Sequence, residues 1–168
     1  MKKLQFVIIA LITTTFFISC QDSKIINKAE DLGHYAFNIL KKLDDIPKEE
    51  FLNHLFTIEE IKVFAEKYKD SMPERAYESF EKLKKEKYEG TIFGEYEELK
   101  KRGEKYTIVW SEIEYSNFTF KKQTQGGLAG IKGVLSFKHK DTLYTVRASA
   151  LEDGTSYIPL IIRRLNKD

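Results

Sequence analysis

Few side chains in this 168-residue sequence have the type and spacing that active-site chemistry requires. The chain has one cysteine, Cys20, and three histidines, His34, His54 and His139. No histidine has a second ligand at the i, i+4 spacing of a helical metal site, and no cluster of His, Cys, Asp or Glu has metal-ligand spacing. We therefore expect neither a metal site nor a bound cofactor.

His139 is the best catalytic candidate among the histidines, because it ends a predicted strand, at the end of a sheet. A histidine in such a position can act as a general acid or base. His34 and His54 lie on predicted helices. A position on the surface, or in the core with hydrogen-bonded ring nitrogens, is favoured for them. A structural role is favoured for His139 as well.

Two further patterns resemble sites but have simpler explanations. The glycines at 126, 127, 130 and 133 suggest a phosphate loop, yet the segment lacks the Lys-Ser/Thr ending and precedes a strand instead of a helix. We expect a flexible hairpin connection there. Most adjacent acidic residues fall in predicted turns or first helical turns, where capping and the helix dipole explain them.

The first twenty residues differ in composition from the rest of the chain. Lys2 and Lys3 precede an apolar run over residues 6–18, which only three threonines interrupt. A charged start, a short apolar stretch and small residues are typical of a secretory signal. A membrane-spanning helix needs about 20 apolar residues, and this run is shorter. Cys20 follows it, and an unpaired thiol in an exported protein calls for an explanation.

The segment Phe17-Ile18-Ser19-Cys20 resembles a lipobox, the motif of bacterial lipoproteins, with Phe17 in place of the usual Leu. The resemblance implies a signal peptide of residues 1–19, which is removed, and an acylated tether of residues 20–23. Cys20 would then carry a diacylglyceryl thioether and an N-acyl chain, so that its partner is membrane lipid. Residues 24–168 would form a single domain in the cell envelope.

The position after the cysteine bears on which membrane holds the protein. Gln21 stands there, and the sorting habit of lipoproteins then implies the outer membrane in preference to the inner one. The alternatives to a lipoprotein are a transmembrane anchor or an ordinary secreted protein with a coincidental cysteine.

Composition limits what the exported domain can be. Without Lys2 and Lys3, the 28 basic residues become 26 and balance the 26 acidic ones. The absence of a global charge gives no support for nucleic-acid binding. A length of about 150 residues suits one domain, large enough to bury a core without disulfides.

The first half of the domain is predicted to be helical. An apolar stripe with alternating steps of three and four residues follows Ser23 and predicts a first helix. Pro47 suits the first turn of a second helix that ends near Phe56. Two capping-box spacings open a third and a fourth helix, Thr57 with Glu60 and Ser71 with Glu74. We expect residue 90, a glycine, to end the fourth helix and a weaker helical piece to cover about 94–103.

The second half of the domain is predicted to form strands. Apolar residues alternate from Lys105 onward, and their phase slips before Phe118, which indicates a bulged or bent first strand. A polar loop is expected from Lys121 to Gly130. Three strands follow, over roughly 131–139, 143–151 and 155–165.

Two predicted turns fix the expected register of these strands. The pair Asp153-Gly154 is a strong two-residue turn, and Asp141-Thr142 is the turn assumed for the preceding hairpin. Both registers place one apolar set on a single face, which should pack against the helices. This set is Leu135, Phe137, Tyr144, Val146, Ala148, Ala150, Tyr157 and Ile161.

The opposite face is expected to be solvated, apart from an apolar strip on the last strand. Its polar members are Lys132, Ser136, Lys138, Thr145, Arg147 and Ser149, and its apolar strip is Ile158, Leu160 and Ile162. Pro159 cannot donate to a sheet ladder and favours an edge position for this strand. Arg163 and Arg164 are expected to guard it against aggregation.

The order of elements predicts an α+β fold, in which amino-terminal helices pack on one face of a carboxy-terminal antiparallel sheet of about four strands. Helices followed by a curved antiparallel sheet resemble the NTF2-like or cystatin-like domains of small bacterial lipoproteins. The resemblance implies a fold that hosts enzymes and binding modules alike and brings no catalytic motif.

Two groups of side chains are candidate binding surfaces. An aromatic set on the bent first strand could line an apolar pocket; it consists of Tyr106, Trp110, Tyr115, Phe118 and Phe120. The strip of Ile158, Leu160 and Ile162 could dock a partner or be covered by the amino-terminal segment.

These patterns predict a membrane-anchored cell-envelope lipoprotein whose domain is a non-enzymatic binding module. Its partner would be an envelope protein or a small apolar or glycan ligand. The alternative is an enzyme with an NTF2-like pocket that uses His139 or a carboxylate as general acid or base. A structural lipoprotein without any ligand is the third possibility.

Overall fold

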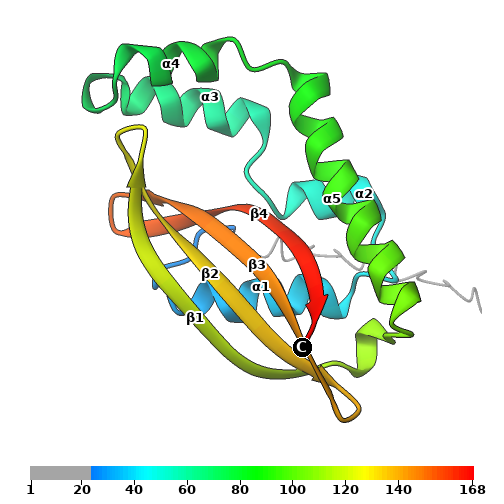
Figure 1. The fold of residues 1–168 in the computed structure, drawn as a ribbon. Coiled ribbons are helices and arrows are strands. Elements are labelled where there is room, and N and C mark those ends of the chain that lie inside the picture. Colours follow the sequence, from blue (N-terminus) through cyan, green and yellow to red (C-terminus); the bar gives the residue numbers. More distant parts are fainter. Residues whose placement is uncertain (1–23) are drawn as a thin grey trace, which may run out of the picture.

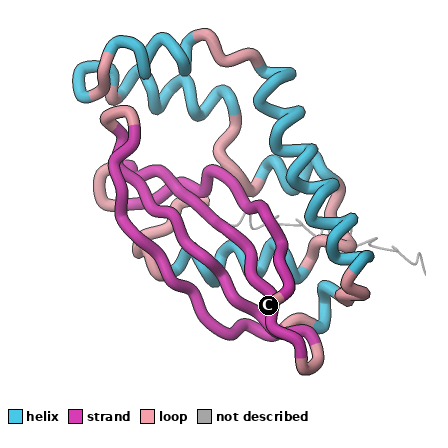
Figure 2. The backbone as a smooth tube through the Cα atoms, in the orientation of Figure 1, coloured by secondary structure: helices cyan, strands magenta, loops and turns pink. Residues whose placement is uncertain are grey.

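The computed structural model describes residues 24–168, and these residues form an α+β fold, as predicted (Figures 1 and 2). The helices are α1 (Asp31–Lys41), α2 (Lys48–Asn53), α3 (Ile58–Lys67), α4 (Glu74–Glu81) and α5 (Lys85–Lys105), with two short 3-10 turns, η1 (Lys69–Ser71) and η2 (Trp110–Glu112). The strands are β1 (Glu114–Gln125), β2 (Leu128–His139), β3 (Thr142–Asp153) and β4 (Ser156–Lys167). The predicted signal peptide, the lipidation of Cys20 and the tether lie outside the described residues.

The sheet is antiparallel with the strand order β1-β2-β3-β4, and α1 lies behind it (Figure 1). The helix α5 runs beside the edge strand β4, while α3 and α4 lie beyond one end of the sheet, near the β1–β2 turn (Figure 1). The face turned away from α1 carries no helix over its central part (Figure 1). This open face is where the candidate site lies.

The helix α1 begins later than the apolar stripe suggests. Ile26 lies in an extended segment instead, where its N–H and C=O exchange hydrogen bonds of 2.9 and 2.7 Å with Tyr157 of β4. The amino-terminal segment thus covers part of the sheet edge that β4 would otherwise expose. From Asp31 onward the stripe is helical, and Leu32, Ala36 and Leu40 are buried against the sheet.

Of the two predicted capping boxes, one is confirmed. The Thr57 hydroxyl accepts a hydrogen bond from the Glu60 N–H, and the Glu60 carboxylate accepts one from the Thr57 N–H. The box predicted at Ser71 is wrong, because Pro73 is the N-cap of α4 and no side chain caps that helix. A proline ring suits this position, since the first turn of a helix has no partner for its N–H groups.

The prediction that a glycine ends the fourth helix at position 90 is wrong. Gly90 and Gly94 both lie inside α5, which runs for 21 residues. A glycine in a helix costs about 1 kcal/mol relative to alanine. The burial of Ile92, Tyr96 and Leu99 on one side of α5 outweighs that cost.

The first strand also differs from its prediction at both ends. It begins at Glu114, because α5 extends to Lys105 and Trp110 lies in the 3-10 turn η2. The predicted bulge is confirmed, since the register shifts between Tyr115 and Asn117. The segment expected to be a loop is mostly strand, and the β1–β2 turn consists of Gly126 and Gly127, both with positive φ.

The other two hairpins pair two residues away from the predicted register. Phe137 faces Tyr144 across a turn at Lys140-Asp141, and Asp153 faces Ser156 across Gly154-Thr155. A slip of two residues leaves every side chain on its predicted face. Seven members of the predicted apolar set are therefore buried: Leu135, Phe137, Tyr144, Val146, Ala148, Ala150 and Tyr157.

A bulge in β4 reverses the facing of residues 161–163, and a second register shift before Asn166 returns Leu165 to the core. The register against β3 shifts between Pro159 and Ile161, which leaves Leu160 as the extra residue. Ile162 consequently faces the core and is 1% exposed, whereas Ile161 lies on the open face. The face predicted for Ile161 and the exposed position predicted for Ile162 are both wrong, because the predicted alternation continues through the bulge. Ile161 is nevertheless partly buried and packs against the hydrophobic core.

The apolar side chains form two clusters. The larger one joins α1, α2 and α5 to the sheet, and the smaller one joins α3 and α4 to Leu128 and to partly buried residues of β3 and β4. Every buried member of both clusters lies between Ile26 and Leu165. The described residues 24–168 thus bury a hydrophobic core of their own.

A polar contact fastens α3 to the end of the sheet. Asp153, at the end of β3, accepts hydrogen bonds from Lys67 Nζ (2.5 Å) and from the Tyr68 hydroxyl (2.8 Å). The hydrogen bond from Lys67 is the main reason that the pKa of Asp153 lies below its usual value. This contact helps to hold the smaller cluster against the strands.

Candidate functional site

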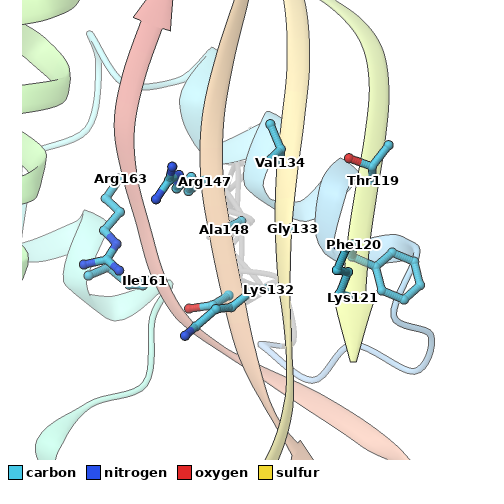
Figure 3. Close-up of a pocket in the computed structure, with 11 residues that line it drawn as sticks. Thr119, Phe120, Lys121, Lys132, Gly133, Val134, Arg147, Ala148, Ile161 and Arg163 are labelled. Atoms are coloured by element: carbon cyan, nitrogen blue, oxygen red, sulfur yellow. The ribbon is translucent and has the colours of Figure 1, made fainter. Parts of the chain in front are cut away.

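A groove lined with basic side chains crosses the open face of the sheet (Figure 3). Each strand contributes one cation: Lys121 from β1, Lys132 from β2, Arg147 from β3 and Arg163 from β4. The groove encloses about 380 Å³, which lies within the range of small-molecule sites. We call it the basic groove, and its other lining residues are Thr119, Phe120, Gly133, Val134, Ala148, Ser149 and Ile161.

The four cations form two like-charge pairs across neighbouring strands. Lys121 lies directly opposite Lys132, and Arg147 lies directly opposite Arg163. Directly opposed like charges destabilise an antiparallel sheet. The stability of the sheet therefore does not account for this arrangement.

The lining of the basic groove contains basic side chains and no acidic ones. Of the ion pairs formed within residues 24–168, none involves Lys121, Arg147 or Arg163. A hollow lined by several cations and by no acidic side chain attracts and concentrates anions.

The floor of the basic groove is apolar. Val134 and Ile161 supply aliphatic side chains, and Val134 is 37% exposed. Gly133 and Ala148 lie between the lysine pair and the arginine pair and leave the backbone accessible to the basic groove (Figure 3). An anionic group bound here would meet lysine and arginine donors over an apolar surface, the combination found in many ligand sites.

The aromatic set predicted to line a pocket does not gather in one place. Trp110 is 1% exposed and packs in the core, with its ring centroid 6.0 Å from that of Phe137. Tyr106 lies 5.8 Å from Tyr144, between ring centroids, and lines a separate charged depression at the end of α5.

The remaining three aromatic residues lie along β1. Tyr115 stacks on His34 with 4.1 Å between ring centroids, and Phe118 stacks on Phe120 at 5.8 Å. Phe118 is wedged against two glycines, Gly33 of α1 and Gly133 of β2. Of the five, Phe120 alone is among the lining residues of the basic groove.

The predicted apolar strip on β4 is divided between two environments. Ile158 and Leu160 are partly buried in the smaller cluster under α3 and α4, and Ile162 belongs to the core. The strand is an edge, as Pro159 indicated, but its backbone is partly covered. The N–H of Phe56 donates to the Pro159 carbonyl at 2.8 Å, beside the pairing of Ile26 with Tyr157.

His139, the residue considered for acid–base catalysis, is 4% exposed and lies at the end of β2. Its Nε2 accepts a hydrogen bond from the Val109 N–H at 3.3 Å, and a Glu112 carboxylate oxygen lies 3.8 Å from the same nitrogen. His139 is not among the residues that line the basic groove. These contacts give His139 a structural role, linking β2 to the segment before β1.

From the sequence alone, Lys132 and Arg147 are predicted to lie on a solvated face and Arg163 to guard against aggregation. Their meeting in one groove is not predicted, because the β4 bulge decides that Arg163 faces the same side as Arg147. The sequence signal for the basic groove is that each strand carries one cation at a position facing the cation of a neighbouring strand. This alignment can be recognised only once the register of the strands is known.

No protein-family model, curated protein or solved structure matches this chain. Within residues 24–168, no helix has the length and apolarity to cross a membrane. In the same range, no three His, Cys, Asp or Glu side chains are grouped so that they could hold a metal ion.

Proposed function

We propose that this chain is a membrane-anchored lipoprotein of the bacterial cell envelope, whose domain binds a small anionic ligand in the basic groove without catalysing a reaction. One observation carries the proposal: four cations, one from each strand, form two directly opposed like-charge pairs with no acidic residue among the lining side chains. An anionic ligand would relieve the repulsion that the free sheet bears.

The lipobox-like segment supports the anchored location. Lys24 lies four positions after Cys20, and four residue steps of extended chain span at most about 14 Å. Lys24 is held in place, since its Nζ donates to the Leu55 carbonyl at 3.2 Å and to the Glu60 carboxylate at 2.9 Å. Acylation of Cys20 would therefore keep the domain, and with it the basic groove, near the membrane surface.

The lining of the basic groove favours binding over catalysis. General acid–base catalysis needs a group that can exchange a proton near neutral pH, such as a histidine or a perturbed carboxylate. The lining residues include neither a histidine nor a carboxylate.

Titration of the segment 24–168 with inorganic phosphate, followed by chemical-shift changes of backbone amides, tests the binding proposal. We expect shifts centred on β2 and β3 around Lys132 and Arg147, and a loss of affinity as the salt concentration rises. Arg163→Gln should weaken binding severalfold, since one of four cations is removed.

Arg164→Gln is the matched control, because Arg164 is the neighbouring residue but does not line the basic groove. Equal effects of the two substitutions, or shifts that avoid the open face, would refute the proposed site. The anchored location is tested separately by mass spectrometry of the mature amino terminus. An acylated Cys20 is expected there, and Cys20→Ser should release the protein from the membrane fraction.

A further inference from the structure

A second, apolar hollow adjoins the basic groove toward the β1–β2 turn. It encloses about 370 Å³ and lies between α4 and the upper end of the open face. We call it the α4 pocket. Its apolar lining residues are Ala76, Phe80, Leu128, Ile131, Ala150, Leu151 and Leu160, and its polar ones include Ser79 and Gln123.

The two hollows lie side by side on the sheet. Lys132 and Ser149 line both the basic groove and the α4 pocket. A ligand bound to the cations could therefore reach past Lys132 into the neighbouring α4 pocket. The basic groove is cationic, and the α4 pocket is lined mainly by apolar groups.

The helix α4 covers the pocket but is itself incompletely packed. None of its residues is buried, and its apolar side chains Ala76 and Phe80 remain only partly covered. It is held to α3 by the smaller cluster and by a hydrogen bond of 2.6 Å from the Tyr77 hydroxyl to Glu66. An apolar chain in the α4 pocket would complete the burial of this helix face.

We infer that the ligand of the basic groove is an anionic amphiphile, whose charged head group binds the four cations and whose hydrocarbon chain lies in the α4 pocket. This inference rests on the proposed function, because it uses the same cations for the head group. Charge complementarity selects an anion, and the shared boundary of the two hollows at Lys132 and Ser149 selects a molecule with an apolar tail on that anion.

A series of alkyl phosphates from ethyl to dodecyl, used below their micelle concentrations, tests the inference by calorimetry on the segment 24–168. Burial of each methylene should raise the affinity about three- to fourfold until the α4 pocket is filled. Inorganic phosphate should bind far more weakly than dodecyl phosphate, and dodecyl maltoside, which has the tail without the charge, should also bind weakly.

A substitution that fills the α4 pocket tests the binding of the hydrocarbon chain separately from the binding of the head group. Ser79 is exposed on α4 and lines the α4 pocket, so Ser79→Trp should block the chain while leaving the core intact. It should abolish the gain from chain length and leave phosphate affinity unchanged. Glu78→Trp is the control, since Glu78 is exposed on the same helix and does not line the pocket.

The outcomes distinguish the inference from the proposed function. An affinity that does not change with chain length, combined with phosphate binding that Arg163→Gln weakens, would overturn the inference and leave the proposed function standing. The absence of binding by every phosphate would overturn both.

A further experiment, with lipid vesicles, identifies the source of the amphiphile. Co-sedimentation with phosphatidylglycerol vesicles that Ser79→Trp reduces would indicate a lipid drawn from a bilayer. A binding series that depends on chain length in solution, without a Ser79-dependent vesicle signal, would indicate a free single-chain amphiphile. Either result supports the anionic amphiphile as ligand.

Discussion

Arg147 on β3 is the direct cross-strand partner of Arg163 on β4. Both side chains point onto the open face of the sheet, and neither forms an ion pair with a described acidic residue. The sheet therefore bears a repulsion that a single substitution could remove.

Arg163→Glu should stabilise the folded domain while it removes anion binding. An opposite charge facing Arg147 replaces a like charge, and such pairs differ by roughly 0.2–1 kcal/mol. Urea unfolding at low salt should show the gain, and about 1 M salt should largely screen it. Arg164→Glu serves as control; an equal gain there would mean that net charge, and not the Arg147–Arg163 pairing, sets the effect.

Ile162→Ala should lower the free energy of unfolding by about 2–5 kcal/mol, the range for truncating a buried aliphatic side chain. Ile162 is 1% exposed on the core side of the β4 bulge. Ile161→Ala, one position away on the half-exposed open face, should cost clearly less. Chemical denaturation measures both values, and a reversed order would contradict the bulge.

Gly133→Ala should destabilise the domain by about 1–3 kcal/mol through overpacking. A Cβ atom at Gly133 would overlap the ring of Phe118, which is also pressed against Gly33. Combining the change with Phe118→Leu should recover part of the loss, because the shorter side chain leaves room. Thermal unfolding of the single and double variants checks the coupling; strictly additive losses would show that the two residues are not in contact.

Gly94→Ala should have the opposite effect. Gly94 lies inside α5, and a Cβ atom there meets nothing within 4 Å. Alanine avoids the entropic cost of a helical glycine and should stabilise the domain by about 0.5–1 kcal/mol. A loss of stability in denaturant unfolding would contradict the continuity of this helix.

Asp153→Asn should lower stability at neutral pH, by at most about 1 kcal/mol for an ion pair near the surface. The pKa of Asp153 in the folded domain lies below its usual value, mainly because Lys67 donates a hydrogen bond to it. The contribution of the carboxylate is therefore present above its unfolded pKa and disappears as the pH falls through the lowered folded pKa.

The wild-type and Asp153→Asn stabilities should thus converge in acid. Unfolding measured from neutral pH to about pH 2 checks this, with Asp141→Asn in the β2–β3 turn as control. A difference that persists unchanged below the folded pKa would show that the ionised carboxylate of Asp153 does not stabilise the domain.

Several elements could be predicted from sequence because their causes are local. The cap at Thr57 depends on a residue three positions away, and the alternation through Leu135 and Val146 assigns a face whatever the exact partner strand. The bulge in β1 showed itself as a slip in the phase of aromatic residues. The α+β class followed from these short-range patterns together.

The extent of α5 and the facing of β4 depended on contacts between distant residues. Gly90 and Gly94 are unfavourable in an isolated helix, and only the packing of Ile92, Tyr96 and Leu99 against the rest of the domain compensates for them. Local propensity contains no information about that packing.

The sequence by itself determined the class of the fold and the faces of β2 and β3, and it predicts an export signal in the first twenty residues. Only the tertiary structure decided that Lys121, Lys132, Arg147 and Arg163 meet in one groove. The physical reason is that each cation lies on a different strand, so that their proximity depends on three registers and on one bulge. A pattern within any single strand cannot reveal a site that exists only across all four.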